Sequence, residues 1–167
     1  LIDLQFLGID NVLALRGDSI KTESVFRPTA DGHSYAVELI EQVSDMNRGN
    51  YIMDDVLLEP TNFCIGAAGY PEKHFGAMNM NTDLMNAKRK VDAGASYLVT
   101  QMFFDNQKYF DFVAACRAIG IDVPIIPGIK PLNNLKHISF IPKYFHIDYP
   151  VALSDELLKC KDNKAVT

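Results

Sequence analysis

The sequence predicts an α/β fold built on a parallel sheet, and three observations support this prediction. Four short apolar segments recur along the 167 residues, namely NVLALR (11–16), FCIGAAG (63–69), SYLVTQMFF (96–104) and VPIIPGI (123–129). None of them alternates between apolar and polar residues, as a half-exposed antiparallel strand does. Helical patterns separate the segments, and a repeated strand–helix–strand order indicates parallel strands joined by right-handed crossovers.

Three amphipathic helices are expected between these strands. The first covers 34–47 and begins at Ser34, a good helix-capping residue. The second covers 82–93 and stops at Gly94, because glycine readily adopts the left-handed conformation that ends a helix. The third covers 106–119 and carries its apolar residues on one face.

Four such units suit either a doubly wound sheet or part of a (β/α)8 TIM barrel. No GxGxxG sequence follows any of the strands, so the main indication of a dinucleotide-binding doubly wound sheet is missing. A complete barrel takes about 250 residues. The sequence begins inside a helix-like segment and ends just after another. We therefore expect residues 1–167 to form one partial barrel domain of about four β/α units, truncated at both ends.

Composition limits the possible partners and the compartment. A net charge of −5 argues against a nucleic-acid partner, because proteins that bind phosphate backbones carry basic patches. No apolar run reaches the roughly 18 residues that a membrane span requires. Cys64, Cys116 and Cys160 lack the spacing of a metal site or a disulfide framework. We expect reduced thiols, no metal and a cytoplasmic protein.

Polar residues collect where the predicted strands end, which is the edge at which α/β proteins bind ligands. Arg16, Gly17 and Asp18 end the first strand, and Gln101 interrupts the apolar run of the third. Each signal alone also fits a simpler explanation. The Arg-Gly-Asp sequence could be an exposed adhesive tripeptide, and a buried glutamine can bond to neighbouring backbone.

The helix expected over 82–93 carries a polar row beside its apolar face. Asp83, Asn86 and Lys90 are spaced by three and four residues, and Arg89 lies one step round the helix. Carboxylate, amide and cations together can bind sugar hydroxyls and phosphates. The usual fate of such a row is a solvated face with local ion pairs, so both readings stay open at this point.

Six blocks in a fixed order resemble methylenetetrahydrofolate reductase of the bacterial type: NVLALRGD, HSYA, GYPEKH, DLMNAKRKVDAGA, TQMFFD and IIPGIKP. The resemblance runs almost from end to end, but it matches only the middle of that enzyme, approximately barrel strands 4 to 7. It implies a (β/α)8 barrel that holds FAD at the carboxyl ends of its strands. The family passes hydride from NADH or NADPH to FAD and then to 5,10-methylenetetrahydrofolate, giving 5-methyltetrahydrofolate for one-carbon metabolism and methionine biosynthesis.

The resemblance also implies roles for individual residues. It places a first group around the flavin: Arg16, Gly17, Asp18, Tyr35, Ala36, Tyr70, His74 and Ala77. It places a second group at the ribityl and diphosphate parts: Asp83, Asn86, Arg89 and Lys90. Gln101 would contact folate and nicotinamide. His137 stands where the family often has a folate-binding glutamine, and a surface helix histidine is the equal alternative.

Asp18 is the expected catalytic residue. The folate of this family is thought to open to a cationic iminium before it accepts hydride, and a nearby carboxylate would stabilise that charge in a partly desolvated site. The sequence lacks the family's first-strand glutamate, which acts as the general acid, and also its eighth strand.

The resemblance predicts a flavin-dependent folate reductase, with a folate as the small-molecule partner and a homo-oligomeric assembly. Neither nucleic acid nor a membrane is expected as a partner. Two other hypotheses remain: a non-catalytic partial barrel that serves as an interaction module, and a barrel enzyme for another phosphorylated ligand. Bound flavin would separate the first hypothesis from the other two.

Overall fold

A four-stranded parallel sheet forms the centre of the computed structural model, which describes residues 1–17, 26–52 and 59–160. Its strands are β1 (Asn11–Ala14), β2 (Cys64–Gly69), β3 (Tyr97–Met102) and β4 (Ile125–Gly128). They lie in the order β1-β2-β3-β4, and every neighbouring pair is parallel. The predicted α/β fold of four strand–helix units is confirmed, with each strand somewhat shorter than its apolar segment.

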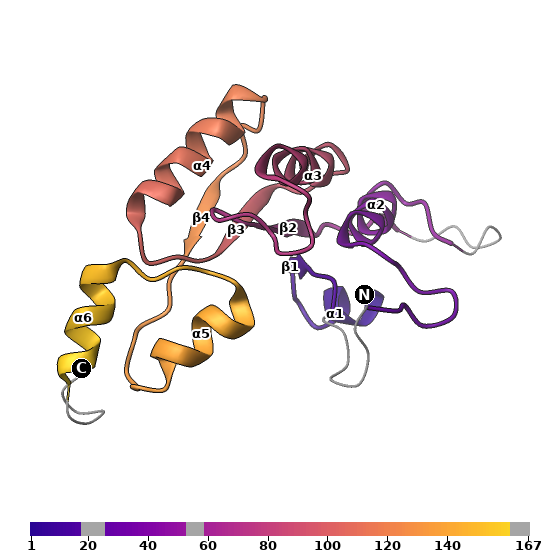
Figure 1. Ribbon diagram of the computed structural model, residues 1–167. Coiled ribbons are helices and arrows are strands. Elements are labelled where there is room, and N and C mark those ends of the chain that lie inside the picture. Colours follow the sequence, from indigo (N-terminus) through magenta and orange to yellow (C-terminus); the bar gives the residue numbers. More distant parts are fainter. Residues whose placement is uncertain (18–25, 53–58, 161–167) are drawn as a thin grey trace.

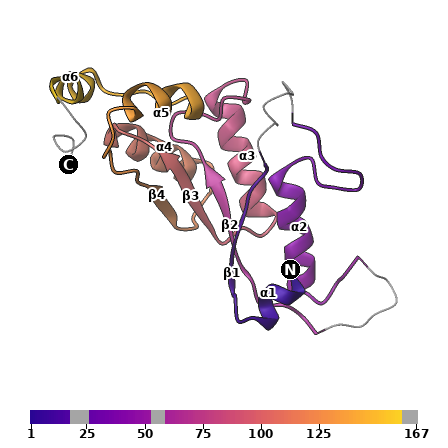
Figure 2. The same ribbon diagram turned by 90° about the horizontal axis from the view of Figure 1, so that it is seen from below.

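Three helices cover one face of this sheet (Figures 1 and 2). They are α2 (Ala36–Asn47), α3 (Met80–Asp92) and α4 (Asn106–Ala118). The prediction that α2 begins at Ser34 is wrong, because Tyr35 is the extended residue that precedes the first turn. The Glu38 carboxylate instead accepts the backbone N–H of Ser34 at 2.6 Å and that of Tyr35 at 3.1 Å. A carboxylate in the first turn thus reaches back to the backbone N–H groups that precede the helix, whereas a capping serine would have accepted N–H groups inside the first turn.

The hydrophobic core lies between these three helices and the sheet. Ile40 of α2, Leu98 of β3 and Cys116 of α4 are fully buried there. Burial raises the pKa of the Cys116 thiol to about 11, so this cysteine stays a neutral, unreactive core residue at neutral pH. Gly94 ends α3 with φ +120°, as the sequence predicted.

Among the described residues, no comparable helical layer covers the opposite face of the sheet. Leu13 of β1 is 42% exposed and Ile126 of β4 is 46% exposed. Parallel sheets are ordinarily covered on both faces. A sheet covered on one face, with sequential strands and outer helices, is the arrangement expected of part of a TIM barrel.

Within the described ranges, three further helices lie outside this layer. The short α1 (Ile2–Phe6) precedes β1. Beyond the carboxyl ends of the strands lie α5 (His137–Phe145) and α6 (Val151–Lys159), as Figure 2 shows. No helix among the described residues is both long and apolar enough to cross a membrane.

Candidate functional site

The loop from β2 to α3 carries three of the predicted site residues. Lys73 adopts a left-handed conformation with φ +74°, and its ammonium donates to the carbonyl oxygens of His74 at 3.0 Å and Ala77 at 2.7 Å. These bonds close the loop on itself. The ring of His74 meets the ring of Tyr70 edge-on, with 4.7 Å between the centroids. Tyr70, His74 and Ala77 therefore belong to one tightly ordered turn.

Asp83 joins this loop to α3. Its side chain sits in the first turn of the helix, where the partial positive charge of the helix terminus favours a carboxylate. The residue is only 6% exposed, and its Oδ2 accepts the backbone N–H of His74 at 2.8 Å. The adjoining turn is fixed by Asn79, whose side chain caps α3 by accepting the N–H of Thr82. The predicted polar row thus begins with a buried carboxylate.

Lys90 lies two turns further along the same helix and points back to the sheet. Its Nζ donates to the carbonyl oxygen of Ala68 in β2 at 2.9 Å and lies 5.7 Å from the centroid of the Tyr70 ring. Burial lowers the pKa of Lys90, and the positive charge of Arg16 lowers it further. The Asp83 carboxylate raises the same pKa but does not cancel the decrease. This cation is therefore held in a place where an additional negative charge would stabilise it.

The other two members of the row contact each other. Arg89 is exposed, and its Nη1 donates to Oδ1 of Asn86 at 3.3 Å. The side chains of Asp83 and Lys90 thus bond to the β2–α3 loop and to β2 rather than to solvent. Asn86 and Arg89 form the local pair that an ordinary surface helix would show.

Arg16, two residues after β1, lies near enough to Lys90 and His74 for its positive charge to lower the pKa of both. Its guanidinium lies 5.4 Å from the ring centroid of Phe26 and 5.9 Å from that of Tyr35. Gly17 follows it on the surface, and Ala36 is the first residue of α2. Asp18, the predicted catalytic residue, lies outside the described residues.

The environment of His74 keeps its imidazole neutral at neutral pH. Burial lowers its pKa below 6.5, Asp83 opposes this, and the cations Arg16, Lys90 and Lys73 lower it further. The neutral ring accepts the Gly76 N–H through Nδ1 at 3.1 Å. The remaining ring nitrogen, Nε2, must then carry the proton, so His74 can act as a hydrogen-bond donor there.

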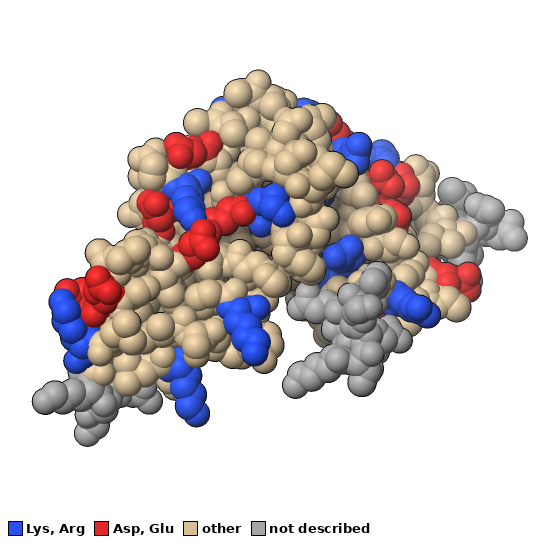
Figure 3. All heavy atoms as spheres, viewed as in Figure 1, with Lys and Arg blue, Asp and Glu red and all other residues tan. Residues whose placement is uncertain are grey.

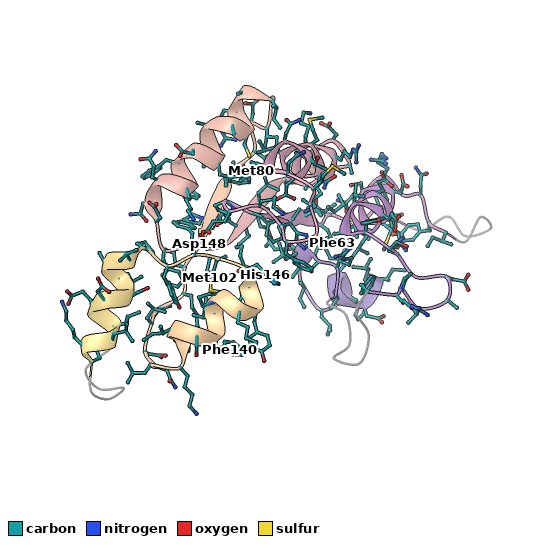
Figure 4. The ribbon with its side chains drawn as sticks, in the orientation of Figure 1. Phe63, Met80, Met102, Phe140, His146 and Asp148 are labelled. Carbon is teal, nitrogen blue, oxygen red and sulfur yellow. The ribbon has the colours of Figure 1, made fainter. Side chains whose placement is uncertain are left out.

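Gln101 lines a pocket of about 130 Å³ beside this cluster. One wall of the pocket is the loop segment 70–75, and the other is the end of α5 with the residues after it, 144–147. Figure 4 shows Met102 and His146, which both line this pocket, near the end of the sheet. The Oε1 atom of Gln101 accepts the N–H of Met102 at 3.0 Å. The structure thus brings Gln101 next to Tyr70 and His74.

His137 is not brought to this pocket. It lies in the first turn of α5, whereas the pocket takes residues from the last turn, such as Tyr144 and Phe145. The side chain of His137 is half-buried, and its Nδ1 is buried without a hydrogen-bond partner among the described residues. The folate-binding role that the resemblance suggested for His137 stays a prediction.

Two residues of the site were missed by the sequence analysis. Lys73 organises the loop through a left-handed backbone conformation, which glycine or asparagine would have signalled but lysine does not. Glu72, in the same GYPEKH block, has a side chain only 7% exposed. A run of charged residues after a strand ordinarily reads as a solvated loop, so no sequence signal marked its burial.

One face of the molecule carries charges of both signs. Acidic and basic side chains lie interspersed on the face shown in Figure 3, without a large area of either sign. Among the described residues, no group of three or more His, Cys, Asp or Glu side chains could hold a metal ion.

Comparison with known proteins gives a consistent family. The family model for methylenetetrahydrofolate reductase matches residues 1–167. "Methylenetetrahydrofolate reductase (NADH) 1" of Zea mays is 37% identical, over 94% of this chain and 26% of its own length. "Probable methylenetetrahydrofolate reductase (NADPH)" of Caenorhabditis elegans is 37% identical, over 96% and 22%. "5,10-methylenetetrahydrofolate reductase" of Salmonella typhimurium is 36% identical, over 96% and 47%. The chain spans less than half the length of each of these relatives.

Proposed function

The chain belongs to the methylenetetrahydrofolate reductase family, and from this premise we propose that it forms part of a reductase that converts 5,10-methylenetetrahydrofolate to 5-methyltetrahydrofolate with FAD and NADH or NADPH. One observation carries the proposal. The loop after β2 contacts Asp83 and Lys90 of α3, and Arg16, which follows β1, lies near enough to act on the charges of His74 and Lys90. Gln101 at the end of β3 lines the pocket beside this polar cluster. Ligands of barrel enzymes bind at this edge of the strands.

The residues of the cluster fit FAD. The buried ammonium of Lys90 has its pKa lowered by burial, so an anionic diphosphate would supply the negative charge that stabilises it. The Arg89 guanidinium can bind phosphate oxygens, and Asp83 and Asn86 can accept or exchange hydrogen bonds with hydroxyl groups. The Tyr70 ring offers a flat apolar surface to the flavin. When bound, FAD supplies the hydride carrier between nicotinamide and folate, which no amino-acid side chain provides.

The pocket beside the cluster suits the substrates. The side-chain amide of Gln101 can both donate and accept hydrogen bonds, as recognition of a pterin and of a nicotinamide carboxamide requires. The neutral His74 ring adds a donor that brings no further positive charge to the site. Asp18 directly follows Gly17 in the sequence, and we assign to its carboxylate the stabilisation of the cationic form of the folate.

The same proposal extends to the rest of the protein's setting. Residues 1–167 would form a single partial-barrel domain. NADH or NADPH would donate the hydride in the first step of the reaction. The protein would work in the cytoplasm as a homo-oligomer. The product would serve one-carbon metabolism and methionine biosynthesis.

The test uses the full-length protein. It should be purified with bound FAD and should oxidise NADH or NADPH in the presence of methylenetetrahydrofolate. Asp18→Asn should keep its flavin and slow the folate half-reaction by about 10²-fold, the loss typical of one electrostatic group in an active site. Stopped-flow absorbance should show a much smaller change in reduction by the nicotinamide. Equal slowing of both half-reactions would show that Asp18 only positions the flavin, and a protein without flavin or turnover would overturn the proposed function.

A further inference from the structure

A buried carboxylate connects three distant segments at the edge of the Gln101 pocket. Glu72 lies midway between Tyr70 and His74, and its Oε2 accepts from the Lys108 ammonium at 2.8 Å and from the backbone N–H of Asp148 at 2.9 Å. Lys108 also bonds to the Asp148 carboxylate at 3.1 Å. We call Glu72, Lys108 and Asp148 the Glu72 clamp. It ties the β2–α3 loop to α4 and to the chain that leaves α5.

The clamp sits where one wall of the pocket ends. Residues 144–147 form that wall, and Asp148 comes directly after them. A left-handed residue, His146 with φ +54°, turns the chain at this point, and its ring stacks on Phe75 with 4.9 Å between the centroids. The bond from Asp148 to Glu72 therefore holds the wall against the loop that forms the opposite wall.

The cofactor side of the site does not depend on this clamp. The loop is bound to α3 through Asp83 and the His74 N–H, and α3 is bound to β2 through Lys90 and the Ala68 carbonyl. Neither bond involves Glu72. The clamp acts on the wall at 144–147 and leaves these attachments in place.

The energetics point away from a role in stability alone. The side chain of Glu72 is only 7% exposed, and its Oε1 has no hydrogen-bond partner among the described residues. Removing a carboxylate from water is costly, and the partly exposed Lys108 repays little of that cost. Partial burial works to lower the pKa of Lys108, but its hydrogen bonds to Glu72 and Asp148 outweigh this and raise it. Lys108 thus remains charged throughout the neutral range.

We propose that Glu72 is a positioning residue: through Lys108 and the backbone of Asp148 it fixes the 144–147 wall against Gln101 and so sets the width of the substrate pocket. The proposal rests on the proposed function, in which folate and nicotinamide bind in this pocket in turn. It gives Glu72 no contact with substrate or cofactor.

The first experiment separates substrate binding from catalysis in the full-length protein. Glu72→Ala should raise KM for methylenetetrahydrofolate and for the nicotinamide donor by about tenfold, while kcat and the FAD content change by less than about twofold. Glu72→Gln should recover most of the affinity, because its amide oxygen can accept both clamp bonds. The matched control is Lys88→Met on α3, which removes a lysine from an exposed pair with Asp92 and should leave KM unchanged.

The second experiment does not require activity. Hydrogen exchange of the amides of residues 146–148 should speed up at least tenfold in Glu72→Ala and remain as in the wild type in Lys88→Met. Unchanged exchange in Glu72→Ala would overturn the positioning role, whether or not the protein carries flavin. An unchanged KM in flavin-loaded Glu72→Ala, or a parallel loss of FAD and substrate affinity, would also overturn it. A wild-type protein without flavin would contradict the proposed function, and the exchange measurement would still decide the clamp.

Discussion

Replacing Lys90 by methionine should separate ligand binding from folding. Methionine keeps the apolar stem of the side chain and removes the ammonium. The change deletes the bond to the Ala68 carbonyl at 2.9 Å and the charge beside the Tyr70 ring. It also removes a buried cation whose pKa is lowered chiefly by burial. The lost hydrogen bond should lower the free energy of unfolding, and the removal of the buried charge should raise it. The affinity for FAD should only fall, because the ammonium that would bind the diphosphate is gone.

The magnitudes follow from these contacts. A hydrogen bond from a charged donor contributes about 1.5–3 kcal/mol, and relief of the desolvation of a buried charge is of similar size with the opposite sign. The free energy of unfolding should therefore change by no more than about 1 kcal/mol. A charge-assisted bond to phosphate of about 1.5–3 kcal/mol corresponds to a loss of FAD affinity of about 10- to 150-fold.

Two titrations measure these effects. Flavin fluorescence gives the Kd for FAD, and urea unfolding gives the free energy of unfolding. Because the folded-state pKa of Lys90 lies below 10.5, the wild type should gain stability relative to Lys90→Met as the pH rises through the range just below 10.5. Lys88→Met is the matched control on the same helix. Unchanged FAD affinity in Lys90→Met would refute the assignment of Lys90 to the cofactor.

Two further predictions concern the fold and its response to pH. His74→Asn should lose less stability than the wild type when the pH falls below 6.5, because the unfolded wild type binds a proton that the folded His74 resists; parallel stability curves from chemical unfolding at several pH values would contradict the lowered pKa. Leu98→Ala should destabilise the protein by about 2–5 kcal/mol, since Leu98 is fully buried between the sheet and the helices, and should lower Tm by about 5–15 °C. A Tm within 2–3 °C of the wild type, a range of about 1 kcal/mol, would show that the core can close around the lost side chain.

The fold could be read from the sequence because its signals are local. Short apolar runs without alternation indicate strands buried in a parallel sheet, and residues such as Gly94 mark helix ends through backbone conformations that few other residues adopt. The boundary of α2 was misjudged by one residue because a capping serine and a carboxylate in the first turn both mark the start of a helix, and here the Glu38 carboxylate accepts the N–H groups of Ser34 and Tyr35. Only the folded geometry selects between them.

The candidate site was predicted in part for the same reason. Residues that follow parallel strands must lie at one edge of the sheet, which explains why Tyr70 and Gln101 line the same pocket. The spacing within α3 placed Asp83 and Lys90 on one face, but spacing cannot tell a solvated face from a buried one. Burial depended on how α3 packs against β2.

The sequence by itself determined the parallel α/β architecture, the family and the edge of the sheet at which a ligand would bind, because each is encoded in periodicity or in the order of short motifs. Tertiary structure alone decided which polar residues are buried and joined across the chain. Glu72 meets Lys108 and Asp148, which lie 36 and 76 positions away, and His137 is kept out of the pocket that the end of its own helix lines. Such contacts depend on how separate elements pack, and packing leaves no signature at fixed spacing in the sequence.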